Sequence, residues 1–158
     1  MNTAYVALGA NLGDPKATVL AAFAALANLP ESRLARCSSL YRTAPVGILS
    51  QPDFVNAVAL LETTLAPEAL LDALLDIEAR FGRIRRERNG PRTLDLDLLL
   101  YDDIELDLPR LTLPHPRLHL RAFVLLPLAE VAPDLAIPRR GSVAAWLPAV
   151  ANQGIVRL

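Results

Sequence analysis

Two aspartates two positions apart, Asp95 and Asp97, lie inside an otherwise apolar stretch. On an extended strand, side chains at this spacing point to the same face, about 6.6 Å apart. Such carboxylates repel one another and are costly to bury, so a positive group is needed beside them. Aspartate oxygens on a rigid element suit Mg²⁺ that also binds phosphates. We therefore predict a magnesium site, with the opposite face of the strand formed by Leu94, Leu96, Leu98 and Leu100.

The segment directly before this strand is rich in arginine. Residues 80–92 contain six arginines and a single acid, Glu87. Arginine binds phosphate oxygens through two parallel hydrogen bonds, and a polyphosphate needs both such donors and bridging cations. The alternative is that Asp95 and Asp97 simply pair with these arginines in a structural network.

A second group of residues could bind a flat ring. Phe54 and Asn56 share one face of a predicted strand. An aromatic ring beside an amide suits a heteroaromatic base, because the ring stacks and the amide hydrogen-bonds to an edge. The alternative is a core phenylalanine beside an asparagine that binds a turn.

Two loops are further candidates for anion binding. His115 lies between two prolines, near Arg110 and Arg121, and could donate to a phosphate or simply be solvated. The segment 9–13 has a glycine at each end and precedes a helix, but it lacks the spacing of known phosphate-binding loops, so a tight turn explains it better.

The elements that must position these residues follow from periodicity and from capping residues. Asp14 and Pro15 predict a helix start, and Pro67 predicts another. We expect helices over residues 14–28 and from 64–66 to 81, and strands over residues 3–8, 33–42, 54–63 and 93–101. This βαββαβ order predicts an α+β, ferredoxin-like core with a mostly antiparallel sheet and helices on one face.

The C-terminal residues are expected to be additions to this core. We predict a short hairpin over residues 102–108, a loop over 109–121, a helix over 122–131 that Pro127 could bend, and a final helix capped by Ser142 that carries Trp146 as a core anchor. If these additions cover the second face of the sheet, the domain has α/β/α layers and the two aspartates line a cleft.

Composition limits the function classes. The 158 residues are 53% hydrophobic with a net charge of −1, which predicts a single domain over residues 1–158 and no general attraction to nucleic acid or membrane. The single cysteine, Cys37, allows no internal disulfide, and neither a signal peptide nor a membrane-spanning run is seen. We expect a cytoplasmic protein. The sequence does not determine its oligomeric state, and we expect a monomer.

Taken together, these segments resemble the 6-hydroxymethyl-7,8-dihydropterin pyrophosphokinase family of folate biosynthesis. The resemblance rests on AYVALGANLG (4–13), SSLYRTAP (38–45), QPDFVNAV (51–58), LPHP (113–116) and above all GPRTLDLDLLLY (90–101). It implies the ferredoxin-like fold read above and a transfer of pyrophosphate from ATP, as co-substrate, to the hydroxymethyl group of the reduced pterin, with release of AMP.

The resemblance also implies residue roles. Two Mg²⁺ ions would be held by Asp95 and Asp97. Catalysis would involve Arg83, Arg85, Arg92, Asp95, Asp97 and His115. The nucleotide would be bound by Glu78, Arg83, Arg85, Arg86, Arg92, Leu98, Arg110, Thr112, His115 and Arg121. The pterin would be bound by Thr43, Ala44, Val46, Phe54, Asn56, Asp95 and Phe123, with the two phenylalanines on either side of the ring.

The chain departs from the family pattern at three positions. Asn89 replaces a frequent tryptophan, Ala44 a frequent proline, and Pro116 an aromatic residue found in some relatives.

Two other function classes remain open on sequence alone. An RNA-binding module would also use a ferredoxin-like sheet, although this chain has only eight aromatic residues for base stacking. A regulatory domain would bind the nucleotide without turning it over.

Overall fold

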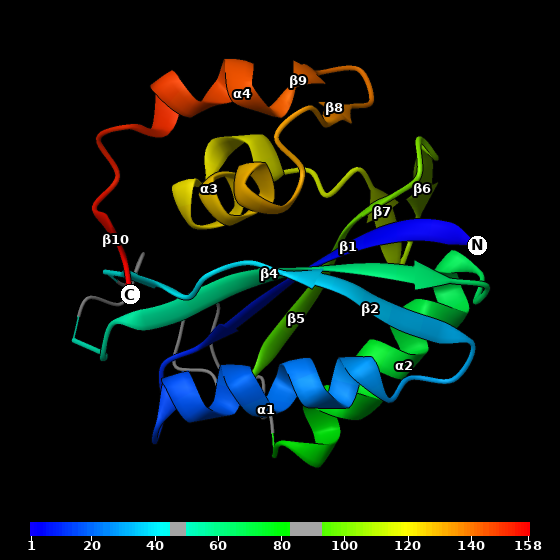
Figure 1. Cartoon of the computed structure of the whole chain (residues 1–158), viewed down its shortest axis with the longest axis horizontal. Coiled ribbons are helices and arrows are strands. Elements are labelled where there is room, and N and C mark those ends of the chain that lie inside the picture. The colour runs from blue at the N-terminus through cyan, green and yellow to red at the C-terminus, as the bar shows by residue number, and fades with distance from the viewer. Residues whose placement is uncertain (45–49, 83–92) are drawn as a thin grey trace.

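The computed structural model describes residues 1–44, 50–82 and 93–158, which form a central sheet with helices on both faces (Figure 1). The core elements are β1 (Asn2–Ala10), α1 (Pro15–Ala27), β2 (Ser32–Cys37), β3 (Tyr41–Thr43), β4 (Phe54–Thr63), α2 (Pro67–Arg80) and β5 (Asp95–Tyr101). The C-terminal elements are β6 (Leu106–Leu108), β7 (Leu111–Leu113), α3 (Ala122–Val131), β8 (Ala136–Ile137), β9 (Gly141–Ser142), α4 (Val143–Trp146) and β10 (Ile155–Arg157).

The central sheet confirms the predicted βαββαβ core. Its strand order is β10-β3-β4-β1-β5, with β2 also paired to β4, and all of these pairings are antiparallel. The strand expected over residues 33–42 is in fact two strands, β2 and β3. Ser38 holds the break between them against β4, because its N–H donates to the Val58 carbonyl at 2.9 Å and its hydroxyl accepts from the Val58 N–H at 2.8 Å.

Two hydrophobic cores lie on opposite faces of the sheet. One contains Leu26 of α1 and Leu74 of α2. The other contains Leu125 of α3 and Val143 of α4. The C-terminal additions therefore cover the second face, as predicted, and the domain has α/β/α layers (Figure 1). An RNA-binding module would need an accessible sheet face for base stacking, and here both faces pack against helices.

The pairing of β5 with β1 is irregular, so the leucines of β5 do not all lie on one face as expected. The register with β1 passes from Val6–Leu98 to Tyr5–Leu100, so Leu99 is an extra residue in β5. A bulge of this kind reverses the alternation beyond it. Leu94, Leu96 and Leu98 pack in the core beneath α1 and α2, as expected, whereas Leu100 packs in the core beneath α3.

The helix ends follow the sequence signals closely. Asp14 caps α1 by accepting the Ala17 N–H at 3.1 Å, and Ser142 caps α4 by accepting the Ala144 N–H at 3.2 Å. Helix α3 spans the predicted residues, including Pro127. Trp146 is only half-buried, so it flanks the second core instead of anchoring it, and its indole N–H donates to the Arg140 carbonyl at 2.9 Å.

The hairpin expected over residues 102–108 is displaced along the chain. Its strands are β6 and β7, which pair around residues 109 and 110, within the segment predicted as a loop. That segment also contains a 3₁₀ turn, Leu118–Leu120. The hairpin is displaced because the side chains of Leu111 and Leu113 are buried in the first core. None of the helices in the described ranges has both the length and the apolar character needed to span a membrane.

Candidate active site

Two pockets share one lining residue, Asp97 of β5. The first, of about 390 Å³, is lined by Ala7, Leu8, Gly9, Thr43, Ala44, Phe54, Asn56, Asp95, Asp97, Arg117, Leu120, Arg121, Phe123 and Gln153. The second, of about 350 Å³, is lined by Leu71, Leu75, Leu96, Asp97, Leu98, Pro109, Arg110, Leu111, Thr112, His115 and Pro116. A ligand in each pocket could therefore reach the same residue.

Sheet register explains why the first pocket is open beside the acids. Asp95 and Asp97 are half-buried on β5, where they pair with Gly9 and Ala7 of β1. Because these two partners have the smallest side chains, they leave space above the strands. The N–H of Leu96, between the two aspartates, donates to the carboxylate of Glu78 on α2 at 2.6 Å, which holds this part of β5 in place.

The amide of Asn56 is held at the wall of the first pocket. Its Nδ2 donates to the Thr43 hydroxyl at 2.9 Å, and Asn56 is 5% exposed. Its Oδ1 lies over Gly9, where a Cβ atom would come within 2.9 Å of it. The glycine thus provides room for the amide, and the threonine fixes its orientation. Gly9 itself belongs to β1, so the connection between β1 and α1 is formed by residues 11–14.

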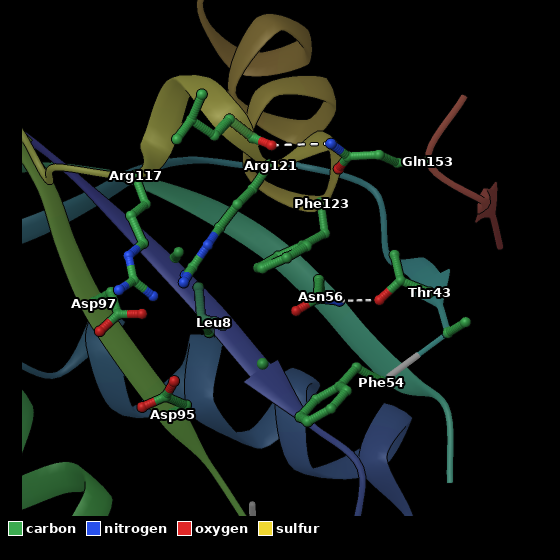
Figure 2. Close-up of a pocket in the computed structure, with 14 residues that line it drawn as sticks. Leu8, Thr43, Phe54, Asn56, Asp95, Asp97, Arg117, Arg121, Phe123 and Gln153 are labelled. Atoms are coloured by element: carbon green, nitrogen blue, oxygen red, sulfur yellow. Dashed lines mark hydrogen bonds between the residues drawn. The ribbon is translucent and has the colours of Figure 1, made fainter. Parts of the chain in front are cut away.

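Aromatic rings approach the first pocket from two sides. Figure 2 shows Phe123, at the start of α3, and Phe54, at the start of β4, on opposite sides of Asn56. The guanidinium of Arg121 extends beside Phe123, with its Cζ atom 5.4 Å from the ring centroid. A flat heteroaromatic ligand could lie between the phenylalanines with its edge toward the amide.

His115 in the second pocket is a neutral hydrogen-bond donor. Burial, together with the charges of Arg121 and Arg117, lowers its pKa to about 4, although Asp95 opposes this shift. Its Nδ1 accepts the Arg117 N–H at 3.2 Å. The proton of the neutral ring is therefore on Nε2, from which it can be donated to a ligand oxygen.

Other residues of the second pocket provide one cationic group and several apolar contacts. Arg110 forms an ion pair with Asp72 of α2, which sets the direction of its side chain. Leu71, Leu75 and Leu98 form an apolar wall on which a flat group can lie.

Most of the described residues that were predicted for the site line one of the two pockets. Those at the first pocket are Thr43, Ala44, Phe54, Asn56, Asp95, Asp97 and Phe123. Those at the second are Asp97, Leu98, Arg110, Thr112 and His115. Arg121, predicted for the nucleotide, lines the first pocket together with residues predicted for the pterin. Glu78 lines neither of them, because it is buried beneath β5.

Five predicted site residues and one family departure lie outside the described residues. They are Val46, Arg83, Arg85, Arg86, Arg92 and Asn89. The other two departures, Ala44 and Pro116, line the first and second pocket respectively.

Two polar residues that line the first pocket, Arg117 and Gln153, were not predicted from the sequence. Arg117 lies four positions before Arg121, and this repeat of cations after His115 was a usable signal. Gln153 comes from the C-terminal segment, and nothing in the local sequence indicates that it reaches this pocket.

The amino-acid sequence is similar to those of known proteins over nearly its whole length. The pattern of the family described as "7,8-dihydro-6-hydroxymethylpterin-pyrophosphokinase (HPPK)" matches residues 5–133. The 2-amino-4-hydroxy-6-hydroxymethyldihydropteridine pyrophosphokinase of Pseudomonas aeruginosa is 53% identical over 154 residues, which are 98% of this chain and 95% of that one. The enzyme of the same name from Haemophilus influenzae is 44% identical over 158 residues, which are 100% and 99% of the two chains.

Comparison with solved structures supports the fold. The crystal structure of Plasmodium falciparum HPPK-DHPS with SDX-DHP matches with a TM-score of 0.71 at 15% identity. The match covers 94% of this chain and 43% of that chain, so the present chain spans less than half the length of that protein.

Proposed function

Because this chain belongs to the 7,8-dihydro-6-hydroxymethylpterin-pyrophosphokinase family, we propose that its two pockets hold the two substrates of that reaction side by side. The enzyme transfers a pyrophosphoryl group from ATP to the hydroxymethyl oxygen of 6-hydroxymethyl-7,8-dihydropterin and releases AMP. The observation that carries the assignment of the pockets is that Asp97 lines both. A hydroxyl in one pocket and a polyphosphate in the other would meet at this carboxylate.

The first pocket suits the pterin. Phe54 and Phe123 offer stacking surfaces for its two faces, and the amide of Asn56 offers a donor and an acceptor for its polar edge. Thr43 orients that amide through its hydroxyl. The hydroxymethyl group would then extend toward Asp95 and Asp97 on β5.

The second pocket suits ATP. Its leucines provide an apolar surface for the adenine ring, and Arg110, Thr112 and His115 provide donors for ribose and phosphate oxygens. The arginines of residues 83–92 are further candidates for phosphate binding, on the family resemblance alone.

The acid pair fits magnesium. Asp95 and Asp97 provide hard oxygen donors from one face of a strand, at the junction of the pockets. In the described part of the chain, no group of three or more His, Cys, Asp or Glu residues gathers in a metal-binding arrangement. Mg²⁺ that is shared with substrate phosphates needs only one or two protein carboxylates. When bound, the metal would neutralise phosphate charge and make the hydroxyl more acidic.

The chain's own groups account for binding and for charge stabilisation. The pterin hydroxyl oxygen forms a bond to the β-phosphorus, the bond from that phosphorus to the α,β-bridging oxygen breaks, and AMP leaves with that oxygen. The hydroxyl proton passes to solvent. Nε2–H of His115 and the guanidinium groups of Arg117 and Arg121 stabilise the negative charge that develops on the phosphoryl oxygens. The two phenylalanines hold the pterin so that its hydroxyl stays near that phosphorus.

Product analysis tests this function. The protein is incubated with ATP, Mg²⁺ and 6-hydroxymethyl-7,8-dihydropterin, and the nucleotide products are separated. We expect AMP and the pterin diphosphate in equal amounts. A 6-methyl-7,8-dihydropterin control, which lacks the acceptor oxygen, should give no AMP. Formation of ADP, or binding of ATP without turnover, would contradict the proposal.

A further inference from the structure

The C-terminal segment makes a two-point contact with the chain on either side of Arg121. The side-chain amide of Gln153 donates from Nε2 to the Leu120 carbonyl at 2.9 Å and accepts at Oε1 from the Ala122 N–H at 2.9 Å. Both hydrogen bonds join one side chain to the backbone that carries the Arg121 guanidinium into the first pocket. In Figure 2 the dashed line at Gln153 marks the bond from its Nε2, above the Arg121 side chain.

This contact supplies a cap that α3 lacks. Arg121 is the N-cap residue of α3 and makes no side-chain capping bond. The first N–H groups of a helix have no partner within the helix, so another group must satisfy them. Ala122 is 1% exposed, which makes its N–H costly to leave unpaired, and Gln153 provides the acceptor from 31 positions away.

The same segment also joins the opposite wall of the pocket. Directly after Gln153, β10 pairs with β3, and Ile155 lies opposite Thr43. Thr43 is the residue that orients the Asn56 amide. Residues 153–157 therefore connect the α3 side of the pocket, with Arg121 and Phe123, to the strand that holds the polar edge.

We propose that Gln153 is a positioning residue for the pterin pocket, setting Arg121 and Phe123 by capping α3 from the C-terminal segment. This inference rests on the proposed assignment of that pocket to the pterin. The family pattern ends at residue 133, so this role lies in a part of the chain that the pattern does not include. Gln153 lines the first pocket and not the second, so its direct effect is expected on the ligand of the first pocket.

The test compares Gln153→Met with Gln153→Glu. Methionine keeps the length and volume of the side chain without its hydrogen bonds, whereas glutamate keeps an acceptor for the Ala122 N–H. For Gln153→Met we expect the KM for the pterin to rise about tenfold, the amount expected for one or two lost hydrogen bonds, with the KM for ATP unchanged. Gln153→Glu should recover part of the loss. Asn152→Ala, at the adjacent exposed amide, is the matched control and should behave as the unmodified protein.

Hydrogen exchange provides a readout that does not require catalysis. Loss of the cap should speed amide exchange at the start of α3 in Gln153→Met, and not in Asn152→Ala. If the unmodified protein makes no AMP, the proposed function is refuted. If amide exchange at the start of α3 is nevertheless faster in Gln153→Met, the capping role of Gln153 is still supported. If the unmodified protein is active and the KM for the pterin is the same in Gln153→Met, the positioning role is refuted. A rise in both KM values with a lower melting temperature would mean a purely structural role, which also refutes it.

Discussion

The chemistry of the site depends on a few side chains, each of which is held by a close neighbour. Thr43 orients the Asn56 amide, and the Arg117 backbone selects the tautomer of His115. Asp95 and Asp97 face small residues of β1, so their carboxylates border open space. Changes at these residues are therefore expected to alter function more than folding.

Asp97 is expected to be required for turnover. Asp97→Asn keeps the size of the side chain but removes the charge that would hold Mg²⁺ between the two pockets. We expect kcat to fall by about 100-fold or more, with an unchanged or slightly higher melting temperature because repulsion from Asp95 is relieved. AMP formation and a melting curve without Mg²⁺ measure the two effects. A large drop in melting temperature would instead favour the structural ion-pair alternative.

Gly9 is expected to matter through Asn56. In Gly9→Ala the new Cβ would lie 2.9 Å from Oδ1 of Asn56, which is too close, so the buried amide must move and weaken its bond to Thr43. We expect the affinity for the pterin to fall about tenfold, as for a lost hydrogen bond, while ATP affinity is kept. Titration with each substrate separately tests this. Gly154→Ala, where a Cβ meets no atom within 4 Å, is the control.

His115 should make the ligand-free protein less stable in mild acid. Its pKa is about 4 in the folded chain, against 6.5 as the ordinary value. Between these two pH values the unfolded chain binds a proton that the folded chain does not, so stability falls as the pH is lowered through this window. The melting temperature of His115→Gln should therefore fall less steeply between pH 6.5 and pH 4. Parallel curves for the two proteins would contradict the lowered pKa.

At the scale of elements, α3 is the part that joins the two walls of the first pocket. Its first turn carries Phe123, and its last turn carries Glu130. Glu130 accepts hydrogen bonds from the Ser39 N–H at 2.9 Å, the Ser39 hydroxyl at 2.7 Å and the Tyr41 hydroxyl at 2.8 Å, and it pairs with Arg157 of β10 at 3.3 Å. The helix is thus attached at both ends to β3 or to the segment that pairs with β3.

Replacement of Glu130 is expected to loosen this attachment. Burial alone would raise the pKa of Glu130, but the bonds from Ser39 and Tyr41 outweigh it and lower the pKa. The carboxylate therefore stabilises the fold above its ordinary pKa of 4.5, and the stabilisation is lost as the pH falls below that value. For Glu130→Gln we expect a melting temperature lower by about 2–6 °C at pH 7. The difference should shrink toward pH 4, and a constant difference would argue against this network.

At the scale of the whole molecule, one sheet belongs to both hydrophobic cores. Strand β1 contributes Leu8 to the core beneath α1 and α2, and Tyr5 to the core beneath α3. Neither core can lose its packing without exposing residues of the same strands. We therefore predict that residues 1–158 behave as a single domain.

A melting experiment tests this cooperativity and the metal site together. We expect a single transition for the free protein, shifted upward when Mg²⁺ and a non-hydrolysable ATP analogue are added together, since a ligand that binds only the folded state stabilises it. Mg²⁺ should shift the transition little on its own, and the combined shift should be largely lost in an Asp95→Asn/Asp97→Asn variant. Two separate transitions would contradict the single domain, and an undiminished shift in the double variant would contradict the metal site.

The sequence by itself determined most of the local structure. Asp14 with Pro15, Ser142 and the apolar periodicity located the helices, and the run rich in Val, Ala and Leu over residues 54–63 located β4 correctly. The spacing of Asp95 and Asp97 was enough to predict that they share one face of the strand, and both line the first pocket. These inferences hold because capping and alternation are set by neighbours within a few residues.

Only the tertiary structure decided which distant residues share a pocket. The bulge that turns Leu100 to the α3 side depends on the pairing of β5 with β1, and the bonds of Gln153 link positions 31 residues apart. The sharing of Asp97 by two pockets depends on how the segment that carries His115 packs against β5. Contacts of this kind result from the packing of whole elements, so residue type and local spacing do not specify them.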